Sequence, residues 1–389
     1  MEIQLNSHNV FTYLLQQQLC SSEELQNNKI ELISAKNFNL LVELSTGQKL
    51  LVKQERKFQD GKTAGEFLNE WRIQKFTQYF PEITNDSFTF PEVLHFDPDN
   101  SIIIFRWLDN YRDLSDFYLK ENVFPSKIAY SIGRDLASLH RATFERSDYQ
   151  DFFVRRDSED GNSERLNNYY ENQVLLLFHR LKRISPEIFG QVPADGLKFF
   201  LLYQRFDSLE KAIAELGNAL KPCCLTHNDL KLNNILLQTS GWDESGDRIA
   251  RFIDWERASW GDPAFDLGSL VSSYLQLWLG SLVASKSLSI EESLSLATVP
   301  LELIQPSIGA LVSAYFDTFS EITKHYPDFL QRVVQCAGFI LIQQTQAGIQ
   351  YQKSFDNTSI CMLQVAKSLL CRPKSSISTV LGHNVQKVA

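Results

Sequence analysis

The chain has 389 residues, of which 43% are hydrophobic and 22% charged, and its formal net charge is -9 at pH 7. This composition is typical of a folded globular protein and excludes a disordered or fibrous chain. The acidic balance argues against nucleic acid or an anionic membrane as a partner, because both attract Lys- and Arg-rich surfaces. The N-terminal stretch has no basic segment followed by an apolar one, as a signal peptide would. We therefore expect a cytoplasmic protein.

The first part of the chain predicts a sheet accompanied by helices. Apolar spacing indicates short helical turns within residues 8–28. Runs rich in apolar residues over 30–55, interrupted by "AKNFN" and "STGQ", predict three antiparallel strands joined by hairpin turns. A helix is expected over 63–80, ended by Pro81, and two further strands are expected within 90–108 around the turn "DPDN".

The rest of the chain is predicted to be mainly helical. An amphipathic helix is expected over 128–144, and the polar run 155–168 is expected to be an exposed insertion. Asp262 is the expected N-cap of a further helix, with Pro263 at its first position. Helical spacing continues from residue 280 to about 370.

These patterns predict three segments. Residues 1–108 form a small β-rich lobe with a helical N-terminal extension, and residues 109–371 form a large helical lobe. Residues 372–389 are expected to be a disordered tail.

One polar segment between two apolar stretches carries a recognisable spacing. "HNDLKLNN" contains His227, Asp229 and Asn234, and Asp254 follows Asn234 by twenty residues at the end of the apolar strand in "FIDWE". Phosphoryl transfer from a nucleotide needs a carboxylate that orients the accepting hydroxyl, and oxygen ligands that hold Mg²⁺ against the phosphates. Asp229 suits the first role, and Asn234 and Asp254 suit the second.

These residues resemble the signature of the aminoglycoside phosphotransferase and choline kinase family, which belongs to the protein-kinase-like superfamily. The family pattern H-[GN]-D-x-x-x-x-N matches "HNDLKLNN", and "IDWE", "GDPAFDLGSL" and "LASLH" are similar to other family segments. The resemblance covers roughly residues 30–280. It implies an α+β, bilobal protein-kinase-like fold with a small antiparallel-sheet lobe and a large helical lobe. It also implies ATP, or GTP in its place, together with Mg²⁺.

The resemblance implies that Lys53, in the strand "KLLVKQE", contacts the α and β phosphates. A helix carboxylate should pair with this lysine. Glu70 and Glu66 lie one helical turn apart, and the family spacing favours Glu70.

Two further parts of the nucleotide site follow from the same resemblance. The loop "SAKNFN" contains no glycine, so its backbone is expected to approach phosphate less closely, and Ser34 is expected to hydrogen-bond a phosphate instead. Main-chain groups between Phe105 and Leu108, including Trp107, are expected to hold the adenine.

Around Asp229, the resemblance implies a supporting set of residues. His227 is expected to support the loop, and Asp266 is expected to accept hydrogen bonds from loop amides. Lys231 is expected to offset negative charge near the transferred phosphate.

The acceptor and the activity leave alternatives. The first hypothesis is phosphorylation of a small-molecule hydroxyl; the second is phosphorylation of Ser or Thr in a peptide or natural-product precursor. The third is an inactive kinase-like module that binds a nucleotide or a partner. Acidic residues would favour an amino sugar or choline as acceptor. Tyr274, Trp278 and Trp260 could bind a quaternary amine by cation-π contact or belong to the core.

Overall fold

We describe the protein from a computed structural model, in which residues 3–25, 29–33, 35–59, 61–86, 88–155, 194–240, 249–283, 288 and 290–382 are described. The chain forms two compact units. The N-terminal unit comprises Met1–Arg112, Leu236–Trp242 and Arg251–Ala258, and the C-terminal unit comprises Asp113–Ile235, Asp243–Ala250 and Ser259–Ala389.

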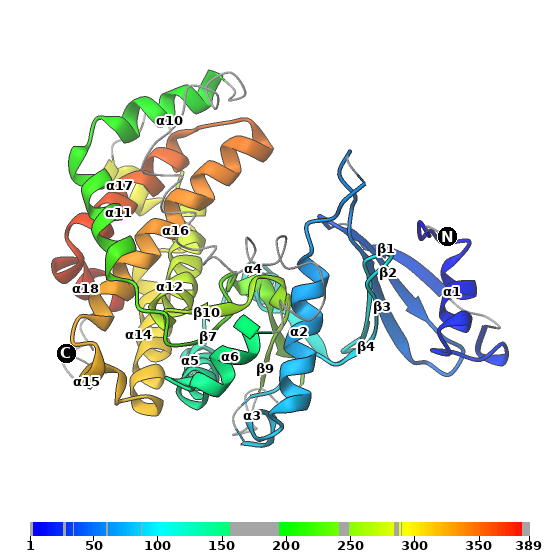
Figure 1. Ribbon diagram of the computed structural model, residues 1–389. Helices are drawn as coiled ribbons and strands as arrows, with labels where there is room; N and C mark the ends of the chain where they lie inside the picture. Colours follow the sequence, from blue (N-terminus) through cyan, green and yellow to red (C-terminus); the bar gives the residue numbers. More distant parts are fainter. Residues whose placement is uncertain are drawn as a thin grey trace. The chain divides into compact units, whose positions relative to one another are not determined.

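A five-stranded antiparallel sheet forms the centre of the N-terminal unit (Figure 1). Its strands are β1 (Lys29–Ile33), β2 (Phe38–Glu43), β3 (Lys49–Gln54), β4 (Val93–Asp97) and β5 (Ile102–Arg106), in the order β1-β2-β3-β5-β4. The three hairpin-connected strands and the two later ones are confirmed.

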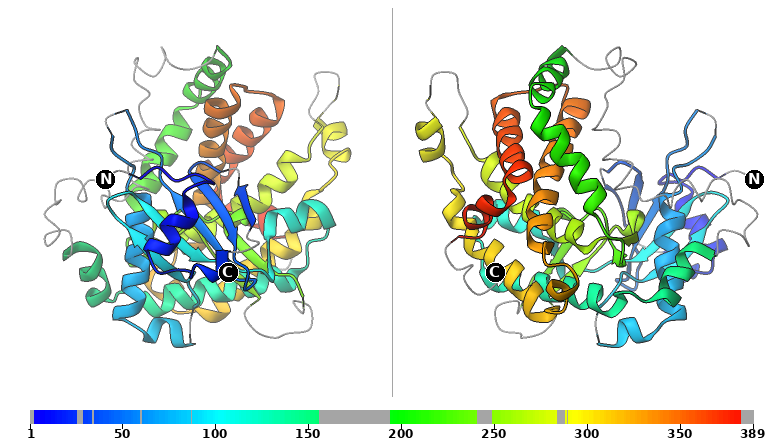
Figure 2. Two further views of the ribbon diagram at one scale, coloured as in Figure 1. Left: turned by 90° about the vertical axis from the view of Figure 1, so that its right-hand side faces the viewer. Right: turned by 60° about the vertical axis from the view of Figure 1, so that its left-hand side comes forward.

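Each face of this sheet is covered by a helix. Helix α1 (Val10–Gln16) buries Leu14 against Leu40 and Val52 on one face, and it lies in front of the sheet in the left view of Figure 2. Helix α2 (Glu66–Tyr79) buries Phe67 against the other face. Successive strand residues point to opposite faces, so a strand covered on both sides reads as a continuous apolar run such as "IIIF" in β5.

The N-terminal unit also contains short elements outside the main sheet. A three-stranded sheet has the order β6-β8-β9, and most of its residues belong to this unit. The remaining bounds are η1 (Glu23–Leu25), α3 (Glu82–Asp86), β6 (Tyr111–Asp113), β8 (Ile235–Gln238), β9 (Ala250–Phe252) and η4 (Trp255–Arg257).

The C-terminal unit is mainly helical. Helix α5 packs against α14, α12 against α16, and α16 against α17. The bounds are α4 (Leu114–Glu121), α5 (Ser126–Thr143), α6 (Ser147–Arg155), α10 (Ala194–Gln204), α11 (Asp207–Ala219), β7 (Cys224–Thr226), η3 (Leu232–Asn234), β10 (Ser259–Gly261), α12 (Pro263–Gly280), α13 (Ile290–Ser295), α14 (Leu301–Thr318), α15 (Ile322–His325), α16 (Phe329–Gln352), α17 (Asn357–Cys371) and α18 (Pro373–Leu381).

The structure confirms two predicted features of the helical part and contradicts a third. The helix expected over 128–144 is α5, and the Asp262 side chain caps α12 by accepting a hydrogen bond from the Ala264 amide at 2.9 Å. The tail prediction is wrong for residues 373–381, which form α18 and bury Val380. Apolar residues at helical spacing stabilise that helix against its neighbours. The polar run 155–168 lies outside the described residues beyond Arg155.

A helix must be both long and apolar to cross a bilayer. In the described part of the chain, no helix combines the length and the apolar character that crossing a membrane requires.

Close packing of α12 on α16 predicts the effect of a single methyl group. A Cβ atom at Gly268 would lie 2.6 Å from Cys336 Cβ and 2.7 Å from the Val333 carbonyl oxygen. Replacing Gly268 with Ala should therefore destabilise the protein by about 1–3 kcal/mol through overpacking. Urea unfolding followed by circular dichroism measures the difference.

Gly348 of α16 provides the matched control, because a Cβ atom there meets nothing within 4 Å. Gly348→Ala should raise the free energy of unfolding by about 0.5–1 kcal/mol, since alanine favours a helix. Equal effects of the two substitutions would contradict the close packing of α12 on α16.

Candidate active site

The segment with the HNDLKLNN spacing forms a loop held by a short two-stranded sheet. Strand β7 precedes the loop and pairs with β10, with Thr226 opposite Ser259. Asn228 has a φ of 62°, in the left-handed region where glycine and asparagine are the best-tolerated residues. Its side-chain nitrogen donates to Ser259 Oγ at 2.8 Å. The backbone therefore explains why this position of the motif accepts Gly or Asn.

Asp266 fixes the loop backbone from the first turn of α12. Its carboxylate accepts hydrogen bonds from the His227 amide at 2.7 Å and from the Asn228 amide at 2.8 Å. Asp266 is fully buried, and its Oδ2 also lies 3.3 Å from Nε2 of His140. The other ring nitrogen of His140 lies 2.8 Å from the Tyr315 hydroxyl. A buried carboxylate is tolerated when hydrogen bonds of this kind satisfy it.

Two side chains of the same loop contact the Asp229 carboxylate. Lys231 Nζ donates to Asp229 Oδ2 at 3.1 Å, and Asn234 Nδ2 donates to the same oxygen at 3.3 Å. Asn234 Nδ2 also donates to the Asp229 main-chain oxygen at 2.9 Å. The structure thus brings Asp229, Lys231 and Asn234 into one cluster. The cluster holds the carboxylate in one orientation and compensates part of its charge.

His227 is completely buried behind this cluster. Its Nδ1 accepts a hydrogen bond from the Asp229 amide at 3.3 Å. This hydrogen bond joins His227 to the loop backbone, and its supporting role stays a prediction.

Asp262 is the second buried carboxylate at the start of α12. Besides capping the helix, Asp262 accepts the Lys221 amide at 2.7 Å and forms an ion pair with the buried guanidinium of Arg332 from α16. Burial raises the pKa of Asp262, although Arg332 acts in the opposite direction. The sequence analysis identified the cap but missed Arg332, because no local pattern links residues seventy positions apart.

In the N-terminal unit, Lys53 of β3 and Asp254 lie in direct contact. Lys53 Nζ donates to Asp254 Oδ1 at 2.6 Å, and the ammonium lies 5.1 Å from the centre of the Phe105 ring. Burial lowers the pKa of Lys53, but the carboxylates of Asp254 and Glu70 more than offset this, and the pKa lies above its usual value. Asp254 has a φ of 61°, a conformation that is uncommon for a residue with a side chain.

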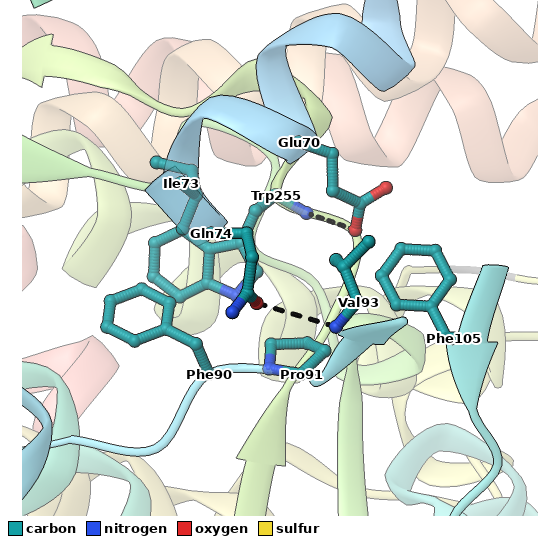
Figure 3. Close-up of a pocket in the computed structure, with 8 residues that line it drawn as sticks. All are labelled: Glu70, Ile73, Gln74, Phe90, Pro91, Val93, Phe105 and Trp255. Carbon is teal, nitrogen blue, oxygen red and sulfur yellow. Dashed lines mark hydrogen bonds between the residues drawn. The ribbon is translucent and has the colours of Figure 1, made fainter. Parts of the chain in front are cut away.

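The direct ion pair expected between Lys53 and Glu70 is not formed in the described structure. Glu70 instead accepts a hydrogen bond from the Trp255 amide at 3.3 Å (Figure 3). The physical reason is competition, because the closer carboxylate of Asp254 already binds the ammonium. The alternative partner Glu66 forms its ion pair with Lys36.

Glu70 lies in a buried, mainly apolar environment. It lines a cavity of about 10 Å³ with Val93, Phe105 and Trp255, a volume that holds about one water molecule (Figure 3). Burial and the nearby carboxylates of Asp254 and Glu256 raise the pKa of Glu70 to about 8, while Lys53 acts to lower it. Glu70 is therefore mainly protonated at neutral pH.

Asn69 is a supporting residue that the sequence analysis missed. Its side-chain nitrogen donates to the main-chain oxygens of Glu256 at 2.8 Å and Ala258 at 2.9 Å. These bonds attach the segment after Asp254 to α2. The only sequence signal was its position beside Glu70 on the same helix.

Ser34 and the Trp107 amide are two further nucleotide contacts expected from the sequence. Ser34 lies outside the described residues. The Trp107 amide donates to the Lys49 main-chain oxygen at 3.0 Å and extends the β3–β5 ladder, so we no longer expect that amide to bind adenine. The Arg106 amide donates in the opposite direction, to the Glu92 main-chain oxygen at 3.1 Å.

The side chains available for Mg²⁺ have suitable chemistry. Asn234 uses its amide nitrogen for Asp229, which leaves the carbonyl oxygen Oδ1 as its ligand atom, and Asp254 supplies a carboxylate. Both are the oxygen donors that Mg²⁺ prefers. No group of three or more His, Cys, Asp or Glu side chains suited to a metal was found among the described residues. Each of the two side chains taken by itself therefore has the chemistry of a Mg²⁺ ligand.

Sequence comparison places this arrangement in a known family. The profile of the phosphotransferase enzyme family matches residues 39–286, which include both the Lys53 and the Asp229 clusters. The chain belongs to this family. No curated protein matched the sequence.

Comparison with solved structures finds chains of similar fold over nearly the whole length. A choline/ethanolamine kinase family protein from Mesorhizobium loti is 14% identical, with 96% of this chain and 99% of that chain covered and a TM-score of 0.50. The choline kinase LicA from Streptococcus pneumoniae is 15% identical, with 93% and 99% covered and a TM-score of 0.47. A GDP complex of an aminoglycoside 2'-phosphotransferase is 13% identical, with 96% and 100% covered and a TM-score of 0.48. The kinase-like fold predicted from the sequence is confirmed.

Replacing one carboxylate oxygen of Asp266 with an amide nitrogen tests how much its hydrogen bonds to the His227 and Asn228 amides stabilise the protein. In Asp266→Asn, one loop amide would face an NH₂ group instead of an oxygen, so we expect a loss of about 2–4 kcal/mol in the free energy of unfolding. Urea unfolding measures this loss. Asp317 is an exposed carboxylate on α14, and Asp317→Asn should change stability by no more than about 0.5 kcal/mol. Equal stability of both variants would contradict the described clamp.

The raised pKa of Glu70 predicts how stability changes with pH. The folded protein retains the Glu70 proton up to about pH 8, whereas the unfolded chain loses it near the ordinary value of 4.5. The stability from the protonated form is fully present below pH 4.5 and declines as the pH rises to about 8. Glu70→Gln cannot ionise, so its Tm minus that of the parent should increase from pH 5 to pH 8.

Melting curves at three pH values check this expectation, with Glu302→Gln as an exposed control. The control should give a difference in Tm that hardly changes with pH. A difference for Glu70→Gln that stays constant or becomes smaller would contradict the raised pKa.

Proposed function

We propose that the protein is a Mg²⁺-dependent phosphotransferase that moves the γ-phosphoryl group of ATP to a hydroxyl of a small molecule. The hydroxyl oxygen forms a bond to the γ-phosphorus, the bond from that phosphorus to the β–γ bridging oxygen breaks, and ADP leaves. The proton of the hydroxyl passes to Asp229. The orientation of Asp229 by Lys231 and Asn234 is the observation that supports this proposal most strongly.

Asp229 has the surroundings that a catalytic carboxylate requires. Its backbone is supported by His227, and the preceding amides are held by Asp266. A base with a fixed position reduces the entropy lost on reaching the transition state. Lys231, one-third exposed beside it, would offset negative charge on the transferred group.

Lys53, Asn234 and Asp254 would bind the phosphates and the metal ion. The chemistry that Mg²⁺ supplies when bound is the neutralisation of phosphate charge. In this proposal, the ammonium of Lys53 would contact the α and β phosphates, and the carboxylate of Asp254 would be a ligand for the cation. The contact observed between Lys53 and Asp254 favours the charged form of Lys53, because the Asp254 carboxylate raises the pKa of the ammonium.

Main-chain groups after β5 would recognise the base. Since the Trp107 amide faces β3 and the Arg106 amide faces β4, strand alternation points the main-chain groups of Leu108 away from β3. We therefore assign the adenine contacts to the Arg106 carbonyl and the Leu108 amide. This replaces the Trp107 amide of the sequence analysis.

The size of a cavity beside the catalytic loop supports a small-molecule acceptor. It has a volume of about 710 Å³ and is lined by Lys231, Leu232 and Asn233 of the loop together with helix α12. Sites for small molecules usually have volumes of about 300–1,000 Å³. A peptide would more often use an open groove, so we favour a small acceptor over a Ser- or Thr-containing peptide.

Replacing Asp229 with Asn separates nucleotide binding from transfer. The substitution removes the base but retains a side chain that Lys231 can contact, so ATP affinity should remain within about threefold of the parent while transfer falls at least about 100-fold. Single-turnover formation of ADP in the presence of an accepted alcohol measures the transfer step.

An unchanged turnover rate in Asp229→Asn would contradict the role assigned to this carboxylate. A parent protein that binds Mg²⁺-ATP but transfers to none of the alcohols, amino sugars or Ser-containing peptides would instead indicate the inactive binding module. Turnover with a peptide alone would indicate the second hypothesis.

A further inference from the structure

The side chains that line the 710 Å³ cavity indicate which kind of acceptor it could bind. The cavity lies entirely within the C-terminal unit. The catalytic loop, α4 with the turn after it, α12, α16 and the segment before α14 contribute side chains. The acceptor hydroxyl must reach Asp229, so this cavity beside Lys231 is the place where the rest of an acceptor would lie.

The described side chains that line the cavity carry no negative charge. Within the described part of the chain, no Asp or Glu side chain lines it, and Lys231 is its one charged side chain. A cation transferred from water into this cavity would lose hydration without gaining a counter-charge from the wall. The nearby carboxylate of Asp229 is already bonded to Lys231 and Asn234. The wall therefore disfavours polyamines and quaternary amines.

Aromatic side chains do not provide a cage for a cation either. Tyr118 and Phe124 line the cavity, but their rings pack on each other with centroids 5.1 Å apart, and 1% and 9% of their surfaces are exposed. The hydroxyl of Tyr118 is 2.8 Å from that of Tyr274. Rings packed in this way have no open face for cation-π contact.

The other expected aromatics are also absent from the wall. Tyr274 is buried, and neither Trp278 nor Trp260 is among the described side chains that line the cavity. The core alternative for Tyr274 is therefore the one that the structure supports.

Uncharged polar groups and apolar surface dominate the wall instead. Leu119 is 71% exposed at the rim, and Leu277 and Val299 add apolar area. Hydroxyl and amide groups can pair with hydroxyl, ether or carbonyl groups of a ligand, while Leu119 can cover an apolar face. The uncharged polar side chains include Ser115, Asn122, Asn233, Ser273, Gln276 and Gln344.

We infer that the acceptor is an uncharged amphipathic alcohol, with several oxygen functions and an apolar face, and not an amino sugar or a choline-like amine. This inference rests on the proposed function, because it takes the cavity beside Asp229 as the acceptor site. It goes beyond that function by excluding the two cationic acceptor classes that the sequence resemblance left open.

A pair of isosteric alcohols tests the charge preference directly. Choline and 3,3-dimethylbutan-1-ol have the same shape and differ in the positive charge. Phenyl β-glucoside and kanamycin extend the comparison to larger neutral and cationic molecules. We expect ligand-observed NMR to show binding of the two neutral alcohols at least about fivefold tighter than that of choline and kanamycin. Tighter binding of either cation, or no binding of either neutral alcohol, would overturn the inference.

Two glutamines of α16 provide a charge-reversal test with a matched control. Gln344 and Gln350 are both exposed, but Gln344 lines the cavity and Gln350 is not among the lining residues. Gln344→Glu should shift the choline to 3,3-dimethylbutan-1-ol affinity ratio towards choline by roughly fivefold, because it adds the missing counter-charge. Gln350→Glu should leave the ratio unchanged. An equal shift in both variants, or none in Gln344→Glu, would contradict the cavity as acceptor site.

These binding measurements are independent of phosphoryl transfer. If neutral alcohols bind but no ADP forms with Mg²⁺-ATP, the proposed function fails while the charge preference stands. If ADP forms with choline or kanamycin as the better acceptor, the proposed function stands and the inference fails.

Discussion

The structure depends on two carboxylates buried at the start of α12. Asp266 accepts hydrogen bonds from the His227 and Asn228 amides of the loop that carries Asp229, and Asp262 caps the helix and binds Arg332. Neither carboxylate could remain buried without these partners, since an unsatisfied charge in the interior costs several kcal/mol. Strand β7, the loop and helices α5, α12 and α16 are therefore joined around one helix end. This arrangement positions Asp229 without requiring Asp229 itself to be buried, and so leaves that carboxylate accessible to a substrate.

In the N-terminal unit, three ionisable side chains interact electrostatically. Lys53, Glu70 and Asp254 place one positive and two potentially negative groups in a mostly buried region. Lys53 and Asp254 remain charged as an ion pair, and Glu70 avoids repulsion by holding a proton. Bound phosphates and a divalent cation would change every one of these interactions. Because Asp254 binds the ammonium and Glu70 accepts the Trp255 amide, the ion pair expected between Lys53 and Glu70 is not formed in the described structure.

Much of this was visible in the sequence, for physical reasons that differ between residues. Strands β1 to β5 follow from alternating or continuous apolar runs between turns, and the cap at Asp262 follows from its position before Pro263. Asp229, Lys231 and Asn234 lie within one short loop of the motif, so their closeness follows from the sequence spacing. Contacts between distant residues were not predictable in this way. Tertiary packing decides that Lys53 pairs with Asp254 and not with Glu70, and that Asp262 pairs with Arg332. It also decides the charge of the cavity wall. Helix α18 was missed because its polar, Ser-rich sequence is stabilised by neighbouring helices.

The central claim is that Asp254 and Lys53 form a nucleotide site that requires Mg²⁺. A thermal-shift titration with ATP, with and without Mg²⁺, on the parent protein and on Asp254→Ala, tests it most directly. The account predicts a Mg²⁺-dependent rise in Tm for the parent, and only a small rise that is insensitive to Mg²⁺ for the variant. An equal Mg²⁺-dependent rise in both proteins would contradict the assignment of Asp254, and no rise in the parent would contradict the nucleotide site itself.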